Sequence, residues 1–176
     1  MKTLNQYIKE KLIINQRFDE KLIINKDYHD DGLSPKSFDE LRKIIEDRYD
    51  KLGPGTEQNP IDFNDIDVSN IDSFFDRYKG GIFEGTKFKY IDISDWDVSN
   101  IKSMRGMFYL CNTLKSVGDI SKWDVSKVES MIGMFAHCKT ITSVGDLSNW
   151  DVLNVKYMSY MFHDSGIKNT PSWYKV

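Results

Sequence analysis

Three aspartates recur at a constant spacing in the second half of the chain, and carboxylates are side chains that can bind a metal or move a proton. They are Asp97, Asp124 and Asp151, and successive members are 27 residues apart. A column of carboxylates could bind calcium, as in repeat proteins with Gly-Asp ladders. Because no glycine-rich turn surrounds them, we favour a local role, in which each aspartate accepts backbone N–H groups of its own turn.

Histidine and cysteine are the other candidate metal ligands. His137 precedes Cys138, but a metal site needs three or four convergent ligands, and no further pair accompanies this one. His137 and His163 are 26 residues apart, so they do not share a position in the 27-residue spacing and are not expected to stack. We therefore expect these histidines to lie on the surface and to bind no metal.

The two cysteines are again 27 residues apart, at Cys111 and Cys138. A disulfide between adjacent repeats is one interpretation, because equivalent positions of stacked strands lie about 5 Å apart. The other is a pair of reduced thiols that fill a small core position. Ser165 occupies the same position in the next copy, which favours thiols. The chain also has no phosphate-binding glycine loop and no nucleophile elbow, so we expect no cofactor, no catalytic residue and no enzyme.

The aspartates belong to a longer repeat, in which a tryptophan comes just before the aspartate and methionines and a phenylalanine follow it. The repeat positions are Trp96, Trp123, Trp150, Met104, Met131, Met158, Phe108, Phe135 and Phe162. A period of 20–50 residues is typical of stacked repeats, so these side chains are predicted to form the core. Stacked-repeat proteins are usually scaffolds that bind partners.

Each copy also predicts its own secondary structure. Apolar residues before the tryptophan, such as Leu114, Val117 and Ile120, suggest an extended run, and stacked runs would form a parallel sheet. After the tryptophan, Ser99 is placed as an N-cap and the apolar spacing that follows predicts a short helix. The expected fold is therefore an α/β repeat: a leucine-rich-repeat-like solenoid with a parallel β-sheet on one side, short helices on the other and an N-terminal capping helix.

Three segments are predicted along the chain. Residues 1–33 form an N-terminal arm in which Glu10-Lys11-Leu12-Ile13-Ile14-Asn15 recurs ten residues later; it is either partly ordered or docks on a partner or on the repeat edge. Residues 34–60 contain a capping helix, opened either by Ser34-Pro35 or by Ser37, which forms a capping-box pattern with Glu40, and a linker. Residues 61–176 hold about four repeats and a C-terminal lid; the first copy has Ile66 at the tryptophan position and three extra residues around Gly80-Gly81.

The segment from Asp92 to Phe108 resembles the repeat of the BspA-like leucine-rich repeat family, a bacterial repeat domain of unknown function. The similarity covers about residues 61–165. The resemblance implies a solenoid with a parallel sheet on one side. It also implies partner binding, because the studied members are mostly surface proteins that bind host or bacterial partners.

Composition narrows the function further. A net charge of −3 argues against a basic nucleic-acid-binding face. No signal-peptide core and no membrane-spanning stretch is found, so we expect a cytoplasmic protein that binds no membrane, or alternatively a virion-associated one.

The predicted function is a non-enzymatic protein–protein interaction module. The alternatives are an intracellular phage or mobile-element protein, as a virion component or an inhibitor of a host system, and a bacterial surface adhesin. The partner is a protein of unknown identity; a homo-oligomer through the N-terminal arm is a further expectation.

A binding surface must use side chains that vary between copies. On the predicted helix side these include Arg105, Ile132 and Tyr160, and exposed aromatic residues are common interface anchors. We therefore predict protein binding there. The alternatives are a solvated face without function and the predicted strand side, where Asp92, Asp119 and Asp146 recur.

Overall fold

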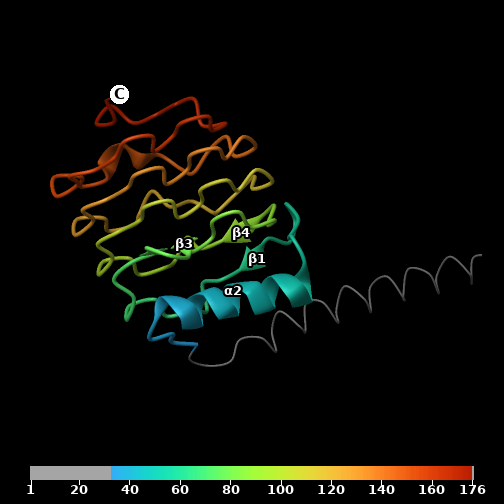
Figure 1. Ribbon diagram of the computed structural model, residues 1–176. Coiled ribbons are helices and arrows are strands. Elements are labelled where there is room, and N and C mark those ends of the chain that lie inside the picture. Colours follow the sequence, from blue (N-terminus) through green and yellow to red (C-terminus); the bar gives the residue numbers. More distant parts are fainter. Residues whose placement is uncertain (1–32, 176) are drawn as a thin grey trace, which may run out of the picture. The chain divides into compact units, whose positions relative to one another are not determined.

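The computed structural model describes residues 33–175. The elements in this range are α2 (Phe38–Leu52), β1 (Ile61–Asp62), β2 (Phe75–Asp76), β3 (Gly80–Gly81), β4 (Ile91–Asp92) and the 3-10 helix η1 (Leu147–Asn149). Strand β1 pairs in parallel with β4, and β2 pairs antiparallel with β3. The repeats lie one above another, with α2 at one end and the C-terminal segment at the other (Figure 1).

Backbone hydrogen bonds join each repeat to the next at every second residue. In the second repeat the N–H groups donate to carbonyls of the third, over 2.8–2.9 Å. These pairs are Met104 to Ser130, Gly106 to Ile132 and Phe108 to Met134. The same pattern recurs one repeat later, with Met131 to Tyr157, Gly133 to Ser159 and Phe135 to Met161. The repeats are therefore joined by a ladder of backbone hydrogen bonds, one at every second residue.

Aromatic rings form two columns inside the stack. Phe83, Phe108, Phe135 and Phe162 follow one another with ring centroids 5.1–5.9 Å apart. Trp123, Trp150 and Trp173 form the second column, at 6.3–6.4 Å. The tryptophans of the 27-residue spacing are at most 5% exposed, as expected of core positions. Met158 differs from its equivalents, because it is only partly buried.

The predicted leucine-rich-repeat-like solenoid is wrong. The described strands are two residues long, they form two separate two-stranded sheets, and no parallel sheet runs along the repeats. The cause lies within the predicted strands. Gly118 and Gly145 have φ of +81° and +90°, which ends an extended run. A Cβ on Gly118 would lie 2.4 Å from Asp92 Oδ1, so glycine is required there.

The predicted short helices after the tryptophans are also wrong, since these segments are successions of turns. Ser99 does not cap a helix; its own N–H donates to Asp97 Oδ1 over 3.0 Å. Gly106 and Gly133 have φ of +56° and +61°, and Leu110 also has a positive φ of +61°. A left-handed residue two positions after the first methionine prevents helical hydrogen bonding from continuing.

Helix α2 covers the first repeat, as predicted for the cap. The helix begins after Ser37, whose hydroxyl accepts the N–H of Glu40. Leu41 and Ile45 are buried against the repeat. Arg48 is 2% exposed and forms a two-point ion pair with Asp65 of the first repeat, over 2.6 and 2.8 Å. Such a fork-to-fork contact fixes orientation as well as position.

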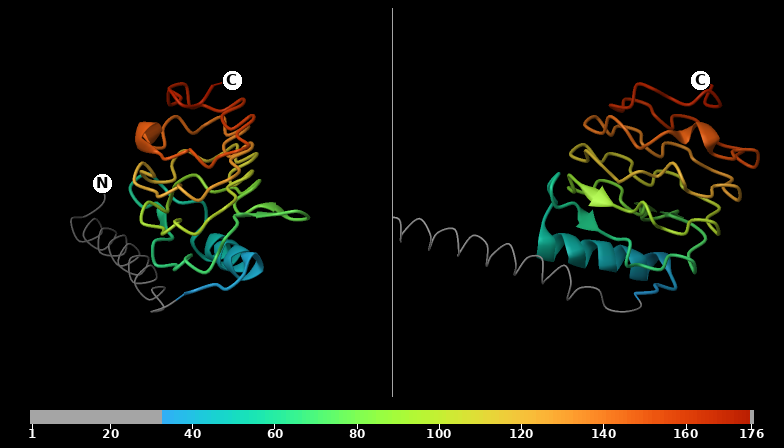
Figure 2. Two further views of the ribbon diagram at one scale, coloured as in Figure 1. Left: turned by 90° about the vertical axis from the view of Figure 1, so that its left-hand side faces the viewer. Right: turned by 180° about the vertical axis from the view of Figure 1, so that it is seen from behind.

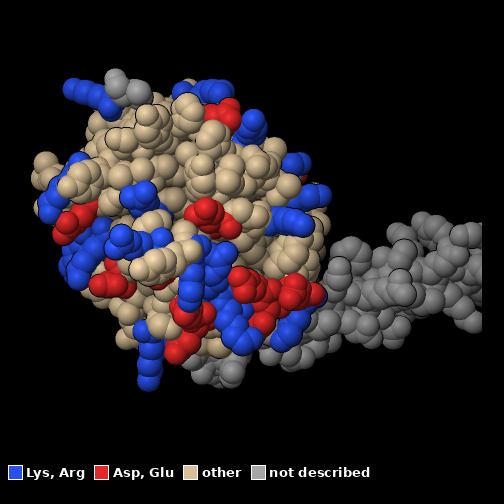
Figure 3. Space-filling view, viewed as in Figure 1, with Lys and Arg blue, Asp and Glu red and all other residues tan. Residues whose placement is uncertain are grey.

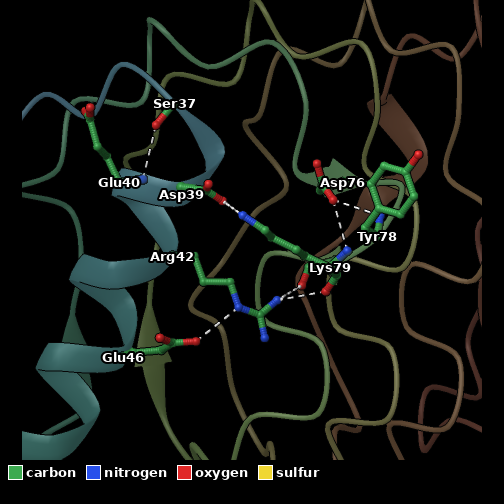
Figure 4. Close-up of polar contacts among 9 residues, drawn as sticks. Ser37, Asp39, Glu40, Arg42, Glu46, Asp76, Tyr78 and Lys79 are labelled. Carbon is green, nitrogen blue, oxygen red and sulfur yellow. Dashed lines mark hydrogen bonds and ion pairs between the residues drawn. The ribbon is translucent and has the colours of Figure 1, made fainter.

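The outer face of α2 holds the β2–β3 hairpin. The Arg42 guanidinium donates to the carbonyls of Lys79 and Gly81 over 3.1 Å, and Lys79 pairs with Asp39 (Figure 4). The hairpin lies where the first repeat has its extra residues, and it projects from the stack (Figure 2, left). Tyr78 at its tip is exposed.

Of the predicted N-terminal arm, residues 1–33, only Leu33 lies among the described residues. Its carbonyl accepts the N–H of Asp67 over 2.8 Å, and Leu33 pairs in parallel with Ile66.

Candidate functional site

A groove of about 570 Å³ runs across the face formed by the Met-x-x-Met-Phe segments. The three predicted contact residues Arg105, Ile132 and Tyr160 all line it, one from each of three successive repeats. The remaining lining residues are Phe75, Gly80, Glu84, Gly106, Tyr109, Gly133, Ala136, His137 and His163. Residues 27 or 28 positions apart in sequence are thus brought onto one surface by the stacking.

The floor of the groove is formed by small residues. Gly106 and Gly133 are buried, and Ala136 is 2% exposed. The two glycines adopt a left-handed turn, in which a side chain is disfavoured. This leaves a depression that Ile132, which is partly exposed, borders.

Tyr160 stands at the same repeat position as these glycines. It has φ of +60°, and its side chain is 66% exposed. A left-handed backbone costs a residue with a Cβ about 1 kcal/mol or more. The fourth repeat therefore places a strained, exposed aromatic residue where the second and third repeats have glycine.

Four rings line one side of the groove in edge-to-face contact. The centroids of Tyr109 and His137 are 5.6 Å apart, those of His137 and His163 5.4 Å, and those of His163 and Tyr160 5.5 Å. His137 and His163 touch edge to face, with their ring planes at 90°, and do not stack. The His137 backbone N–H donates to the His163 carbonyl over 2.8 Å, which continues the ladder of backbone bonds between the third and fourth repeats.

Charges surround the groove. The Arg105 guanidinium lies 4.9 Å from the centre of the Phe75 ring, a cation–π contact that holds it at one wall. At the other wall His137 Nδ1 is 3.0 Å from Asp164 Oδ2, and Lys139 Nζ is 3.2 Å from the same oxygen. Hydrogen bonds from His137 and then Lys139 lower the pKa of Asp164. The groove thus offers apolar, aromatic and charged contacts together.

The recurring aspartates act within their own turns, as predicted. Each accepts the N–H of the residue two positions later over 3.0–3.1 Å, in the pairs Asp97/Ser99, Asp124/Ser126 and Asp151/Leu153. Asp92, Asp119 and Asp146 do the same for Ser94, Ser121 and Ser148. These carboxylates shape the backbone of the stack.

Cys111 and Cys138 are free thiols buried in the core. Their sulfurs donate to the carbonyls of Phe83 and Phe108 over 2.9 and 2.8 Å. The neighbouring Cys111 and burial raise the pKa of Cys138, which keeps that thiol protonated. Among residues 33–175, no three His, Cys, Asp or Glu side chains come together in an arrangement that could hold a metal ion.

The surface charge and the length of the helices bear on binding to other molecules and to membranes. Over α2 and the hairpin, acidic and basic side chains are mixed, whereas the middle of the same face over the later repeats is largely uncharged (Figure 3). No helix in the described part of the chain has the length and apolar character needed to cross a bilayer.

Sequence reasoning missed Tyr109, His137, His163 and Phe75 as groove residues. One sequence signal could have pointed to the groove: Gly106, Gly133 and Tyr160 share a repeat position, and the last copy has a large aromatic residue where the two before it have glycine.

Comparison with known proteins finds one family model, described as "Mycoplasma protein of unknown function, DUF285", which matches residues 70–173. No curated protein matches the chain. No solved structure matches it either. The matched segment contains the second, third and fourth repeats and every groove residue, and it spans more than half of the sequence. The chain therefore belongs to this family of proteins of unknown function, DUF285.

Proposed function

We propose that this chain is a non-enzymatic protein-binding module, and that the groove across its repeats is the contact surface. Arg105, Ile132 and Tyr160 are the proposed principal contacts. Tyrosine and arginine are enriched among the residues that dominate binding energy, and a depression beside them gives a partner side chain a place to enter. The resemblance of the repeat to BspA-like proteins, whose studied members bind partners, supports the same function.

The observation that carries the proposal is the conformation of Tyr160. A strained residue persists when the surrounding structure imposes it, and such residues gather at functional sites. Glycine at this position, as in the two preceding repeats, would remove the strain. An exposed ring contributes little to the core, so its retention there is better explained by a partner.

We also propose that the protein functions in the cytoplasm. The buried free thiols Cys111 and Cys138 suit a reducing compartment, because thiols in oxidising compartments tend to form disulfides.

The test uses the full chain as bait, with mass spectrometry of the proteins it retains. The double variant Ile132→Asp/Tyr160→Ala should lose specific partners that the wild type retains. Leu153→Asp, which changes an apolar side chain that is 91% exposed and outside the groove, is the matched control and should retain them. Retention of the same proteins by a folded double variant would refute the groove. The partner's identity would separate a bacterial interaction module from a phage protein, and recovery of the chain itself would indicate a homo-oligomer.

A further inference from the structure

The far end of the stack leaves one edge of the fourth repeat open. In the third repeat this side is closed by the fourth repeat, and Val125, Val128 and Met131 are at most 1% exposed. The equivalents Val152, Val155 and Met158 are only partly buried. Tyr157 and Tyr160 beside them are 59% and 66% exposed. The apolar stripe therefore continues to the end of the stack without a cover among the described residues.

The C-terminal segment covers a different part of this end. Trp173 stacks on Trp150 at 6.3 Å and donates its indole N–H to the Leu147 carbonyl. Tyr174 meets Phe162 edge-on at 5.1 Å. The segment thus completes the tryptophan and phenylalanine columns and leaves the stretch from Lys156 to Tyr160 uncovered.

The open edge also presents unused backbone groups. In the second and third repeats the N–H groups at the positions of Met158 and Tyr160 donate to the following repeat. In the fourth repeat neither N–H has an acceptor, and the Lys156 carbonyl receives no N–H, among the described residues. In the inner repeats the equivalent Lys102 carbonyl accepts the N–H of Glu129 over 2.8 Å. Such an edge is a template for an added extended segment.

The charge at this edge follows from a column in which signs alternate. The column is Asp72, Lys102, Glu129 and Lys156, one residue from each repeat. Lys102 pairs with Asp72 at 3.4 Å and Lys156 with Glu129 at 2.8 Å. A residue added to this column after the fourth repeat would lie beside Lys156, and the alternation of signs predicts that it is acidic. Two residues further on, every repeat has a large apolar side chain, from Phe74 to Met158.

We propose that this open edge binds an extended peptide segment of a partner protein, with an acidic residue followed two positions later by a large apolar one. The acidic residue lies beside Lys156 and donates its N–H to the Lys156 carbonyl. The apolar side chain covers Met158. Carbonyls of the residues after the acid and after the apolar residue accept the N–H groups of Met158 and Tyr160. This surface is distinct from the groove, although Tyr160 borders both.

The chain's own sequence supplies a probe, since Glu10-Lys11-Leu12 and Glu20-Lys21-Leu22 have this pattern. A labelled synthetic peptide with the sequence of residues 9–16 is titrated into the full chain, and binding is followed by fluorescence anisotropy. The assay is repeated on the Glu10→Lys/Glu20→Lys variant, which removes the acidic residue from both of these segments so that neither competes with the peptide. Saturable binding and slower amide hydrogen exchange at Met158 and Tyr160 are expected.

Three changes test how the peptide is aligned along the open edge, with its glutamate beside Lys156 and its leucine over Met158. Replacing the peptide's leucine at the position of Leu12 by aspartate should weaken binding at least tenfold. N-methylation of its glutamate amide should weaken binding roughly three- to tenfold, because one hydrogen bond is lost. Lys156→Glu in the protein should weaken it by a similar factor, and a peptide with lysine in place of that glutamate should recover affinity for this variant.

The matched control is Lys102→Glu, which also breaks one exposed ion pair but lies two repeats away from the edge. It should bind the peptide like the wild type. Absence of binding to the Glu10→Lys/Glu20→Lys variant, or equal binding by Lys156→Glu and Lys102→Glu, would overturn the proposal. Ile132→Asp should leave peptide binding unchanged, so failure at the edge and failure at the groove are distinguishable.

Discussion

The left-handed conformation of Tyr160 leads to a prediction about stability. Tyr160→Gly and Tyr160→Ala both remove the ring, but alanine keeps a Cβ at a φ of +60°. The Cβ costs about 1–2 kcal/mol in this conformation, and glycine loses about 0.5–1 kcal/mol through its freer unfolded chain. Tyr160→Gly should therefore exceed Tyr160→Ala in free energy of unfolding by about 0.5–1 kcal/mol.

Gly133→Ala makes the reverse exchange at the equivalent position, where φ is +61°. An added Cβ would lie 3.7 Å from the Cβ of Ala136, which is an ordinary contact, so strain is the main effect expected. This variant should lose about 0.5–1 kcal/mol relative to the wild type. Urea denaturation followed by tryptophan fluorescence measures all three variants. If Tyr160→Ala proved as stable as Tyr160→Gly, the strain at this position, and the argument for function built on it, would be refuted.

Three further predictions concern the core and the turns. Trp123→Ala should lower the free energy of unfolding by roughly 3–5 kcal/mol, since the side chain is 5% exposed; an unchanged urea midpoint would contradict its place in the core. Alkylation in denaturant without reductant should modify both Cys111 and Cys138, and intact mass would show two adducts; zero adducts would mean a disulfide. Hydrogen bonds within their turns lower the pKa values of Asp119 and Asp124, so the stability they contribute is present above about pH 4 and is lost as the pH falls through the folded-state pKa. Melting temperatures between pH 7 and pH 2.5 should show this loss, and Asp124→Asn should reduce it.

The repeat period predicted the core well because it depends on stacking alone. Trp96 and Phe108 recur with their equivalents at one spacing, and side chains at one spacing pack on each other whatever the local backbone does. The cap over residues 34–60 was predictable for a similar local reason, since Ser37, Glu40 and an apolar stripe specify a helix without help from distant residues.

Secondary structure within the repeat was not predictable from the same pattern. Apolar residues three or four apart fit a helix, but they fit equally a chain of turns whose glycine is left-handed, and Gly106 decides between the two. Gly118 lies within the predicted extended run of Leu114, Val117 and Ile120, yet its left-handed backbone ends that run.

The candidate site was predicted in part. Variation between copies pointed to Arg105, Ile132 and Tyr160, which the structure gathers in one groove. The contact between His137 and His163 joins two non-equivalent positions of adjacent repeats, so a comparison of side chains 27 residues apart does not find it.

The tryptophan indoles give the stack a direction. Each indole N–H reaches back to a carbonyl of the repeat before it: Trp96 to Phe63, Trp123 to Ile93, Trp150 to Ile120 and Trp173 to Leu147. For these indole bonds, removing the last repeat would leave only an acceptor carbonyl unpaired, whereas removing the first would leave the buried Trp96 indole N–H without its acceptor, which costs about 1–3 kcal/mol. During synthesis, a repeat emerging from the ribosome meets an acceptor already in place, so the stack can grow from its N-terminal end one repeat at a time.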